Sequence, residues 1–208
     1  NTFLKRLVRE KPAASRIDRI AVKPVRPRGA ISFVIKESRS SRGITRLSPD
    51  IALCPDCRRE FYEPCDRRYL YPFINCTNCG PRYTIIENTP YDRRRTAMKK
   101  FIMCPKCGRE FADAGDRRFH AQPNCCPVCG PRFVLYSIRG KLIPAADPIK
   151  KAADLIRRGR IVAVKGIGGF HIACDARNAA AVGRLRSFKN RPTKPFAVMT
   201  GLNDLPRI

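Results

Sequence analysis

The sequence contains four CxxC pairs at regular spacing: Cys54-Pro-Asp-Cys57, Cys76-Thr-Asn-Cys79, Cys104-Pro-Lys-Cys107 and Cys126-Pro-Val-Cys129. Eighteen residues separate the first pair from the second, and eighteen separate the third from the fourth. Each cysteine of the first two pairs recurs 50 positions later, which makes residues 47–140 an internal repeat. Two thiolates on one tight turn can share a tetrahedral Zn²⁺, and a second such turn completes its four ligands. The pattern therefore predicts two zinc sites.

The four pairs can share two ions in two ways. Sequential pairing gives the first two pairs to one ion and the last two pairs to the other, closing loops of 18 residues. Interleaved pairing would close loops of about 68 residues, at an additional closure entropy of only about 1.2 kcal/mol. We expect sequential pairing because each repeat carries a full ligand set. Since all eight ligands are cysteines, with no open position, we expect structural zinc rather than catalytic zinc.

The remaining three cysteines do not fit this spacing. The repeat partners of Cys65 and Cys125 are Gly115 and Asn75, so neither cysteine is expected to be a ligand. Cys174 lies outside the repeat, and we expect a small buried residue there rather than a nucleophile. Extracellular disulfides are the alternative to metal, but the repeated spacing of CxxC pairs favours metal ligands.

Composition narrows the class of partner. The 208 residues include 43 Lys and Arg against 17 Asp and Glu, a formal net charge of +26. This excess favours polyanions such as nucleic acid, nucleotide phosphates or an acidic surface, without choosing among them. There is no run of about 20 apolar residues and no signal-peptide pattern, so we expect a cytoplasmic protein with no membrane partner. The chain starts with Asn1 and stops at Ile208 within a pattern, and we interpret it as part of a longer protein.

Residues 1–46 have the pattern of the end of a small α/β domain followed by a linker. Phe3, Leu4, Leu7 and Val8 recur at helical spacing, and Pro12 ends that helix. Two strands are expected after it, over residues 17–22 and 30–35. Residues 38–46 are polar and basic, which is typical of a linker.

Residues 141–208 have the alternating pattern of an α/β domain. Four elements are expected in order: a helix from Asp147-Pro148 to Gly159, a strand over 161–164, a helix capped by Asp175 and a strand over 196–199.

Two short stretches in this last segment could bind phosphate. A glycine-rich turn follows the first strand and would let backbone approach a ligand closely, although it could also be a plain tight turn. A proline-stiffened loop carries three cations that suit a triphosphate, although it could equally be solvated basic surface. The residues concerned are Gly166, Gly168 and Gly169 in the turn, and Lys189, Arg191 and Lys194 in the loop.

The combination resembles one family. The cysteine repeat, with Arg67-Arg68-Tyr69, Tyr91-Asp92-Arg93 and Arg118-Phe119-His120-Ala121 between its pairs, resembles HypF, the carbamoyltransferases that mature nickel–iron hydrogenases. Lys165-Gly-Ile-Gly-Gly-Phe-His171, with Lys189-x-Arg191-x-x-Lys194-Pro195, resembles the opening of their YrdC-like domain. Residues 1–36 are similar to the second half of their acylphosphatase-like domain.

The resemblance implies an α+β chain of three parts. Residues 1–46 would be the C-terminal part of an acylphosphatase-like domain with a linker. Residues 47–140 would be the tandem zinc-finger module, with four cysteine ligands in each finger. Residues 141–208 would be the N-terminal part of a YrdC-like α/β domain.

The resemblance also implies a reaction. Carbamoyl phosphate would be cleaved in the acylphosphatase-like part, and carbamate adenylated with ATP in the YrdC-like part. The carbamoyl group would then pass to the C-terminal cysteine of the partner HypE, on the way to a cyanide ligand. Lys189 and Arg191 would hold ATP phosphates with help from Lys194, while Lys165, Gly168 and Gly169 would line the carbamoyl-adenylate cleft. No catalytic residue is identified, and we expect these 208 residues alone not to complete the transfer.

Two other functions stay open. A zinc-ribbon module could bind nucleic acid through the arginine pairs at 67–68 and 117–118, with Tyr69 and Phe119 stacking on bases. A chaperone-like zinc scaffold could use paired CxxC turns alone. The α/β pattern after residue 145 argues against the scaffold, which does not need it.

Overall fold

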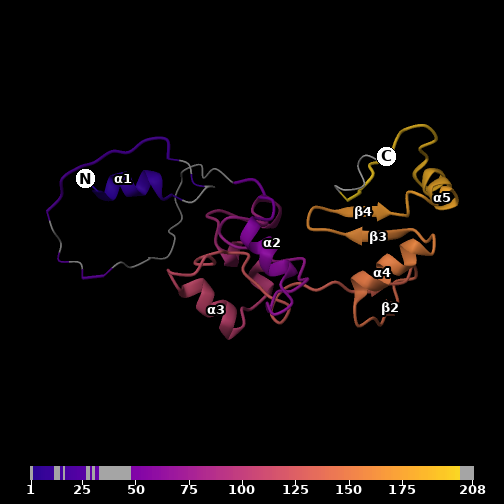
Figure 1. Cartoon of the computed structure of the whole chain (residues 1–208), viewed down its shortest axis with the longest axis horizontal. Coiled ribbons are helices and arrows are strands. Elements are labelled where there is room, and N and C mark those ends of the chain that lie inside the picture. Colours follow the sequence, from indigo (N-terminus) through magenta and orange to yellow (C-terminus); the bar gives the residue numbers. More distant parts are fainter. Residues whose placement is uncertain are drawn as a thin grey trace. The chain divides into compact units, whose positions relative to one another are not determined.

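A computed structural model describes the fold over most of the chain. The described residues are 2–11, 15, 17–26, 29, 31–32 and 48–201. The chain divides into two compact units, Asn1–Pro131 and Arg132–Ile208, and each is described by itself (Figure 1). The predicted boundaries at 46/47 and 140/141 stay predictions. Within the described part of the chain, no helix combines the length and the apolar character of a bilayer span.

The N-terminal segment forms its predicted helix but not its predicted strand. Helix α1 spans Thr2–Arg9. The strand expected over residues 17–22 is wrong, because these residues have no strand pairing. Alternating apolar residues form a strand only when a neighbouring strand takes up their backbone hydrogen bonds, and none of the described residues does so here. Of the strand expected over 30–35, only residues 31–32 are described, and they form none; the linker over 38–46 lies outside the described residues.

Each half of the cysteine repeat begins with a short helix. Helix α2 spans Pro55–Tyr62 and helix α3 spans Pro105–Ala112, each starting immediately after the first cysteine of its repeat. The fixed φ of proline suits the first helical position, where its missing N–H is not needed. In α2 the sulfur of Cys54 caps the helix by accepting from the Cys57 N–H at 3.4 Å. Both helices were missed from the sequence, where tight turns were expected; the signal was the Cys-Pro step in each copy.

The repeat in sequence is also a repeat in backbone conformation. Leu70 and His120, which are 50 positions apart, both adopt left-handed conformations, with φ of 52° and 51°. Their N–H groups donate to the carbonyls of Phe61 and Phe111 at 2.9 and 3.0 Å. A left-handed backbone conformation is unfavourable for a residue with a Cβ. Its recurrence at equivalent positions therefore shows that the two copies have the same local fold.

The remaining regular structure of this unit is short. Among its described residues, three 3₁₀ helices span Tyr83–Ile85 (η1), Arg93–Arg95 (η2) and Ala97–Lys100 (η3). Cysteines make up half of the buried cluster at the centre, which consists of Cys57, Tyr71, Ile74, Cys76, Cys79, Ile85, Met98 and Cys125. Such a core buries little aliphatic surface, as the sequence indicated.

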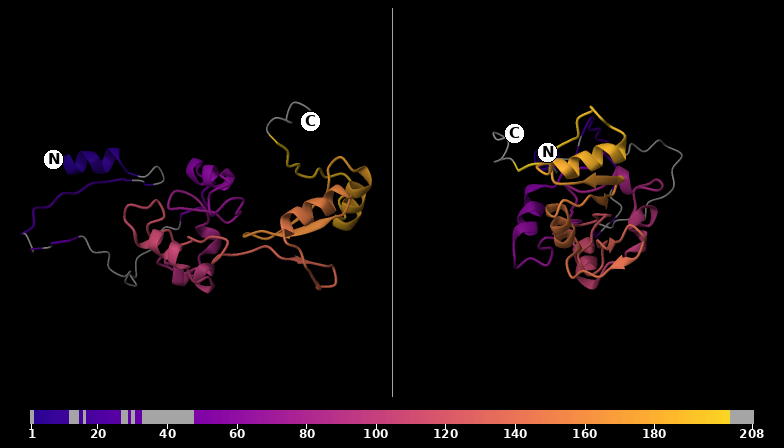
Figure 2. Two further views of the ribbon diagram at one scale, coloured as in Figure 1. Left: turned by 60° about the horizontal axis from the view of Figure 1, so that its bottom comes forward. Right: turned by 90° about the vertical axis from the view of Figure 1, so that its right-hand side faces the viewer.

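In its described residues, the second unit contains two hairpins and two helices, whose arrangement can be followed in Figure 2. Its elements are β1 Leu135–Tyr136, β2 Leu142–Ile143, α4 Pro148–Arg157, β3 Val162–Lys165, β4 Phe170–Ala173 and α5 Ala179–Lys189. Strands β1 and β2 pair antiparallel, as do β3 and β4, and α4 contacts β3. Figures 1 and 2 show α4 and α5 beside the β3–β4 hairpin. Val162, Ala181 and Leu185 are the buried apolar residues described in this unit.

Helix α4 and strand β3 confirm the sequence prediction. Asp147 caps α4 by accepting from the Ile149 and Lys150 N–H groups, both at 3.0 Å. Gly159 follows the helix with a φ of 72°, a conformation that suits glycine. Strand β3 lies within one residue of its expected bounds. Strand β4, which was not predicted, follows the glycine-rich turn.

Two predictions for this unit are wrong. Helix α5 is capped by Asn178, whose Oδ1 accepts from the Ala181 N–H at 2.9 Å, rather than by Asp175. Asp175 instead accepts from the Arg177 N–H at 3.0 Å, forming a turn ahead of the helix. Residues 196–199 form no strand, because none of the described residues pairs with them.

The two aspartates give a matched test of helix capping. We expect Asp147→Ala to destabilise α4 by about 1 kcal/mol, because two N–H groups lose their acceptor. Amide exchange of residues 149–157, followed by mass spectrometry, measures this loss. Asp175→Ala removes the same charge but no helix cap, so it should leave exchange of α5 nearly unchanged. Equal effects on both helices would contradict the assignment.

Candidate metal centres

The sulfur atoms of the eight repeat cysteines gather into two groups. Within each group the four atoms lie within 4.8 Å of one another; the groups are Cys54, Cys57, Cys76 and Cys79, and Cys104, Cys107, Cys126 and Cys129. The chain therefore brings the pairs together in the sequential way. Neighbouring sulfurs are 3.7 to 3.8 Å apart in the first group and 3.6 to 3.8 Å apart in the second. A zinc–sulfur bond of about 2.3 Å gives a tetrahedron with an edge of about 3.8 Å, so both groups fit zinc.

Backbone N–H groups donate to two sulfurs of the first group, those of Cys54 and Cys76. The first cysteine of each repeat precedes a helix, and the second lies at the third position inside it. Backbone N–H groups point at the first site, where the Asn78 N–H lies 3.3 Å from the Cys76 sulfur. Donors of this kind favour the charged form of sulfur that a metal needs. Cys57, Cys76, Cys79 and Cys107 have no exposed surface, which suits a structural ion.

The other three cysteines lie outside both groups, as expected. Cys65 is exposed and Cys174 is partly buried. Cys125 is buried, and burial raises the pKa of its thiol. The Tyr71 hydroxyl lies 3.5 Å from its sulfur and donates to the Pro131 carbonyl at 3.0 Å. This cysteine is therefore a packing residue of the core.

Two glutamates beside the sulfur groups form ion pairs that sequence reasoning missed. Glu60 in α2 accepts from Arg117 and Arg118, and Glu110 in α3 accepts from Arg67 and Arg68. Burial raises the pKa of Glu110, but the bonds from Arg68 and Arg67 outweigh it and lower that pKa to about 2. The sequence did contain a signal for these ion pairs, because Arg-Arg and Arg-Glu-Phe occur at equivalent positions in both copies of the repeat.

These ion pairs bear on the nucleic-acid hypothesis. The two arginine pairs that it relied on donate to glutamates within the unit, and Arg68 and Arg118 are only 1% and 4% exposed. Buried guanidinium groups that are already paired cannot contact phosphates without breaking those bonds. The structure therefore removes the main phosphate contacts from that hypothesis.

The glycine-rich turn joins β3 to β4. The Gly166 N–H donates to the Gly169 carbonyl at 2.7 Å, and Gly169 has a φ of 155°. Lys165 ends β3, with its ammonium 5.2 Å from the centre of the Phe170 ring. A Cβ added at Gly168 would meet no atom within 4 Å, so the turn is open on that side.

The second predicted group lies where the chain leaves α5. Lys189 is the last residue of α5. Asn190 follows it in a left-handed conformation, which ends the helix. Arg191 and Lys194 follow in the loop. Their carbonyls accept from the Arg186 guanidinium at 3.2 and 3.0 Å, so this arginine, which the sequence did not single out, holds the loop. The described contacts do not join this loop to the glycine-rich turn.

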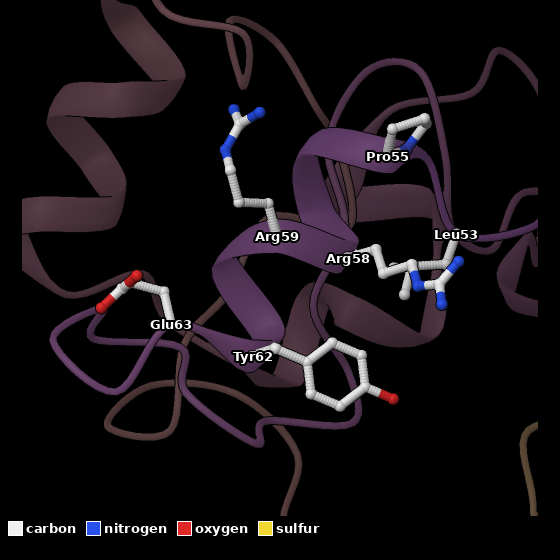
Figure 3. Close-up of a pocket in the computed structure, with 6 residues that line it drawn as sticks. All are labelled: Leu53, Pro55, Arg58, Arg59, Tyr62 and Glu63. Carbon is white, nitrogen blue, oxygen red and sulfur yellow. The ribbon is translucent and has the colours of Figure 1, made fainter.

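An open pocket of about 530 Å³ runs along α2 (Figure 3). Its lining consists of Leu53, Pro55, Arg58, Arg59, Tyr62 and Glu63. The positions of Arg58 and Tyr62 are occupied by Gly108 and Ala112 in the second copy, so the lining is a property of the first copy alone. None of the predicted site residues lines this pocket.

Two family models match the chain. A model described as "HypF finger" matches residues 53–86 and again residues 103–136. The Sua5–YciO–YrdC model, described as "Telomere recombination", matches residues 154–205. The first match covers both sulfur groups, and the second covers both candidate phosphate-binding stretches.

The chain is also similar to complete proteins. It is 52% identical over 200 residues to "Carbamoyltransferase HypF" of Synechocystis sp., covering 96% of this chain and 26% of that protein. It is 54% identical over 197 residues to "Carbamoyltransferase HypF2" of Cupriavidus necator, covering 93% and 24%. A solved structure, "Crystal structure of full-length HypF in the phosphate- and nucleotide-bound form", is 46% identical with a TM-score of 0.88, covering 99% and 27%. The chain thus spans about a quarter of the length of the curated relatives it matches.

Proposed function

Because this chain belongs to the HypF family over the segment that it shares with those proteins, we propose that it forms part of a carbamoyltransferase. The proposed reaction uses carbamoyl phosphate and ATP to form carbamoyl adenylate. The carbamoyl group then passes to the C-terminal cysteine of HypE, for cyanide-ligand synthesis in nickel–iron hydrogenases. The observation that carries the proposal is 52% identity over 96% of the chain to a protein named as a carbamoyltransferase.

We propose that each sulfur group holds one Zn²⁺ in a structural role. The ligands would be Cys54, Cys57, Cys76 and Cys79 for one ion, and Cys104, Cys107, Cys126 and Cys129 for the other. The ion would link the start of a helix to a turn about 20 residues later and so replace a missing apolar core. A cytoplasmic location is part of the proposal, since a reducing compartment keeps such thiols available.

We assign ATP phosphates to the loop after α5. Lys189 and Arg191 would contact phosphate oxygens, Lys194 would assist, and Lys165 with Gly168 and Gly169 would line the carbamoyl-adenylate cleft. The solved HypF structure that this chain resembles is described as phosphate- and nucleotide-bound, which supports a nucleotide for the family. Cations held in fixed positions stabilise the charge that develops on phosphoryl oxygens. The hydrogen bonds from Arg186 to the carbonyls of Arg191 and Lys194 would hold this loop in position.

Titration with a non-hydrolysable ATP analogue tests the nucleotide assignment. We expect Lys189→Ala and Arg191→Ala each to weaken binding about tenfold or more, because each removes a charge-assisted hydrogen bond to phosphate. Isothermal titration calorimetry on the zinc-loaded chain and on a full-length HypF carrying the same changes measures the affinity.

The control is Lys150→Ala, which removes an exposed lysine of α4 and should leave the affinity unchanged. Unchanged affinity in both loop variants would remove the phosphate assignment. A salt-dependent gel shift with a random oligonucleotide, without analogue binding, would instead favour the nucleic-acid alternative.

A further inference from the structure

In each sulfur group, one cysteine sulfur accepts from arginine side chains of the other repeat. Arg67, which lies in the loop of the first repeat, approaches the sulfur of Cys107 with two guanidinium nitrogens at 3.4 Å. Arg68 lies 3.6 Å from the same sulfur. Both arginines also bind Glu110, one turn further along α3, at 2.5 and 2.6 Å. One arginine pair therefore holds both a metal ligand and the helix that carries it.

The reverse contact has the same form. Arg117, from the loop of the second repeat, lies 3.1 Å from the sulfur of Cys57. Arg117 binds Glu60 at 2.6 Å, and Arg118 binds the same carboxylate. Shifting the residue numbers by 50 converts the Arg67–Cys107 contact and the ion pairs of Glu110 into the Arg117–Cys57 contact and the ion pairs of Glu60. The two repeats therefore contact each other as do the halves of a two-fold dimer.

The backbone contacts of the inner arginines complete this exchange. The Arg68 Nε donates to the Cys125 carbonyl at 2.9 Å, and the Arg118 Nε donates to the Asn75 carbonyl at 3.0 Å. Each acceptor directly precedes the third cysteine of a site in the opposite repeat. The arginine pair of one repeat thus touches both cysteine-bearing segments of the other, the helix and the later turn.

Charge explains why such contacts matter to a metal. Four thiolates around one divalent ion leave an excess of negative charge, and N–H donors to sulfur offset it. Second-layer donors to metal ligands typically alter metal affinity by about 10- to 100-fold. Here the donors belong to a loop that is closed by the other ion, because Arg67 and Arg68 lie between Cys57 and Cys76. Losing one ion would free that loop and withdraw the donors from the other site.

We infer that Arg67 and Arg117 are positioning residues of the opposite metal sites and that they make the two sites load zinc cooperatively. The inference rests on the proposal that each sulfur group holds zinc. Coupling between two sites is reciprocal, so each ion should raise the affinity for the other by the same factor, about 5- to 150-fold. Chains with a single ion should accordingly be scarce.

Native mass spectrometry of the full chain tests this inference. The metal-free, reduced chain is mixed with less than two equivalents of Zn²⁺, and chains with zero, one and two ions are counted. We expect mainly zero and two ions, with one-ion chains well below the share that two independent sites give. An independent distribution would overturn the inference while leaving the zinc assignment intact, whereas no zinc binding would overturn both.

A pair of double variants separates the arginines from general folding effects. R67Q/R117Q should shift the distribution toward one-ion chains and weaken zinc binding against a competing chelator about 10- to 100-fold. The matched control is R59Q/R109Q, which removes equal charge from equivalent exposed positions of α2 and α3. Arg59 binds Asp56 at 2.9 Å rather than a sulfur. Unchanged cooperativity in R67Q/R117Q, or equal loss in the control, would overturn the assignment to these arginines.

Discussion

Removing zinc is expected to unfold the tandem cysteine module while the β3–β4 hairpin and its helices keep their structure. Half of the buried central cluster of the module is cysteine, and its two α-helices have eight residues each. Helices of that length are unstable without support. Structural zinc contributes about 10–16 kcal/mol per site in small peptides, and whole domains are stable by only about 5–15 kcal/mol. The free energy that zinc contributes is thus as large as the whole expected stability of the module, so we expect the module to unfold when both ions leave.

Hydrogen exchange with mass spectrometry measures this outcome segment by segment. The chain is treated with a chelator under reducing conditions, and zinc release is counted with a colorimetric reagent, with two ions per chain expected. Amides of α2 and α3 should lose protection, whereas those of α4 and α5 serve as an internal control, since the described part of their unit contains neither sulfur group. Persistent protection in metal-free α2 and α3 would contradict the structural role of zinc.

The two sulfur groups were the part of the molecule that the sequence predicted best. A zinc ion demands four ligands of one chemistry at short range, so Cys54 and its seven partners must be spaced to meet, and that spacing is legible in one sequence. Sequential pairing followed from the duplication. The two ends of α4 could also be predicted, because Asp147-Pro148 and Gly159 act through contacts with residues only a few positions away.

Features that depend on contacts between residues far apart in the sequence could not be predicted. Residues 17–22 and 196–199 have strand-like patterns, but a pattern cannot show whether a neighbouring strand is available, and none is found among the described residues. Helices α2 and α3 are too short for an amphipathic period to emerge. The ion pairs of Arg68 with Glu110 and of Arg118 with Glu60 join residues more than 40 positions apart, and only the fold brings these residues together.

The same reasoning applies to the choice between functions. The basic charge of +26 favoured polyanions in general. Four arginines of the cysteine module pair with Glu60 and Glu110. In contrast, Lys189 at the end of α5 and Lys194 in the loop held by Arg186 are exposed. Charge that is already paired supports the fold, and exposed charge on a fixed loop is what a phosphate ligand can use. This division favours a nucleotide at the second unit over nucleic acid at the first.

The Gly130→Ala variant is expected to lose about 3 kcal/mol of stability, although it adds a single methyl group. A Cβ at residue 130 would lie 2.2 Å from the Tyr71 hydroxyl and 2.7 Å from the Cys125 Cβ. The backbone there cannot move away easily, because the Gly130 N–H donates to the Cys126 carbonyl at 2.8 Å within the turn that carries Cys126 and Cys129. Tyr71 must move and give up its bond to Pro131, so overpacking and a lost hydrogen bond add together.

Thermal unfolding of the zinc-loaded chain measures the effect, with free zinc held constant because metal binding shifts the melting temperature. We expect the transition of the cysteine module to fall by more than about 10 °C. Gly108→Ala is the matched control, since a Cβ at that position of α3 meets no atom within 4 Å and alanine favours a helix by about 1 kcal/mol. The control should melt at the same or a higher temperature. If Gly130→Ala melts no lower than Gly108→Ala, then Tyr71 does not pack against Gly130 as described.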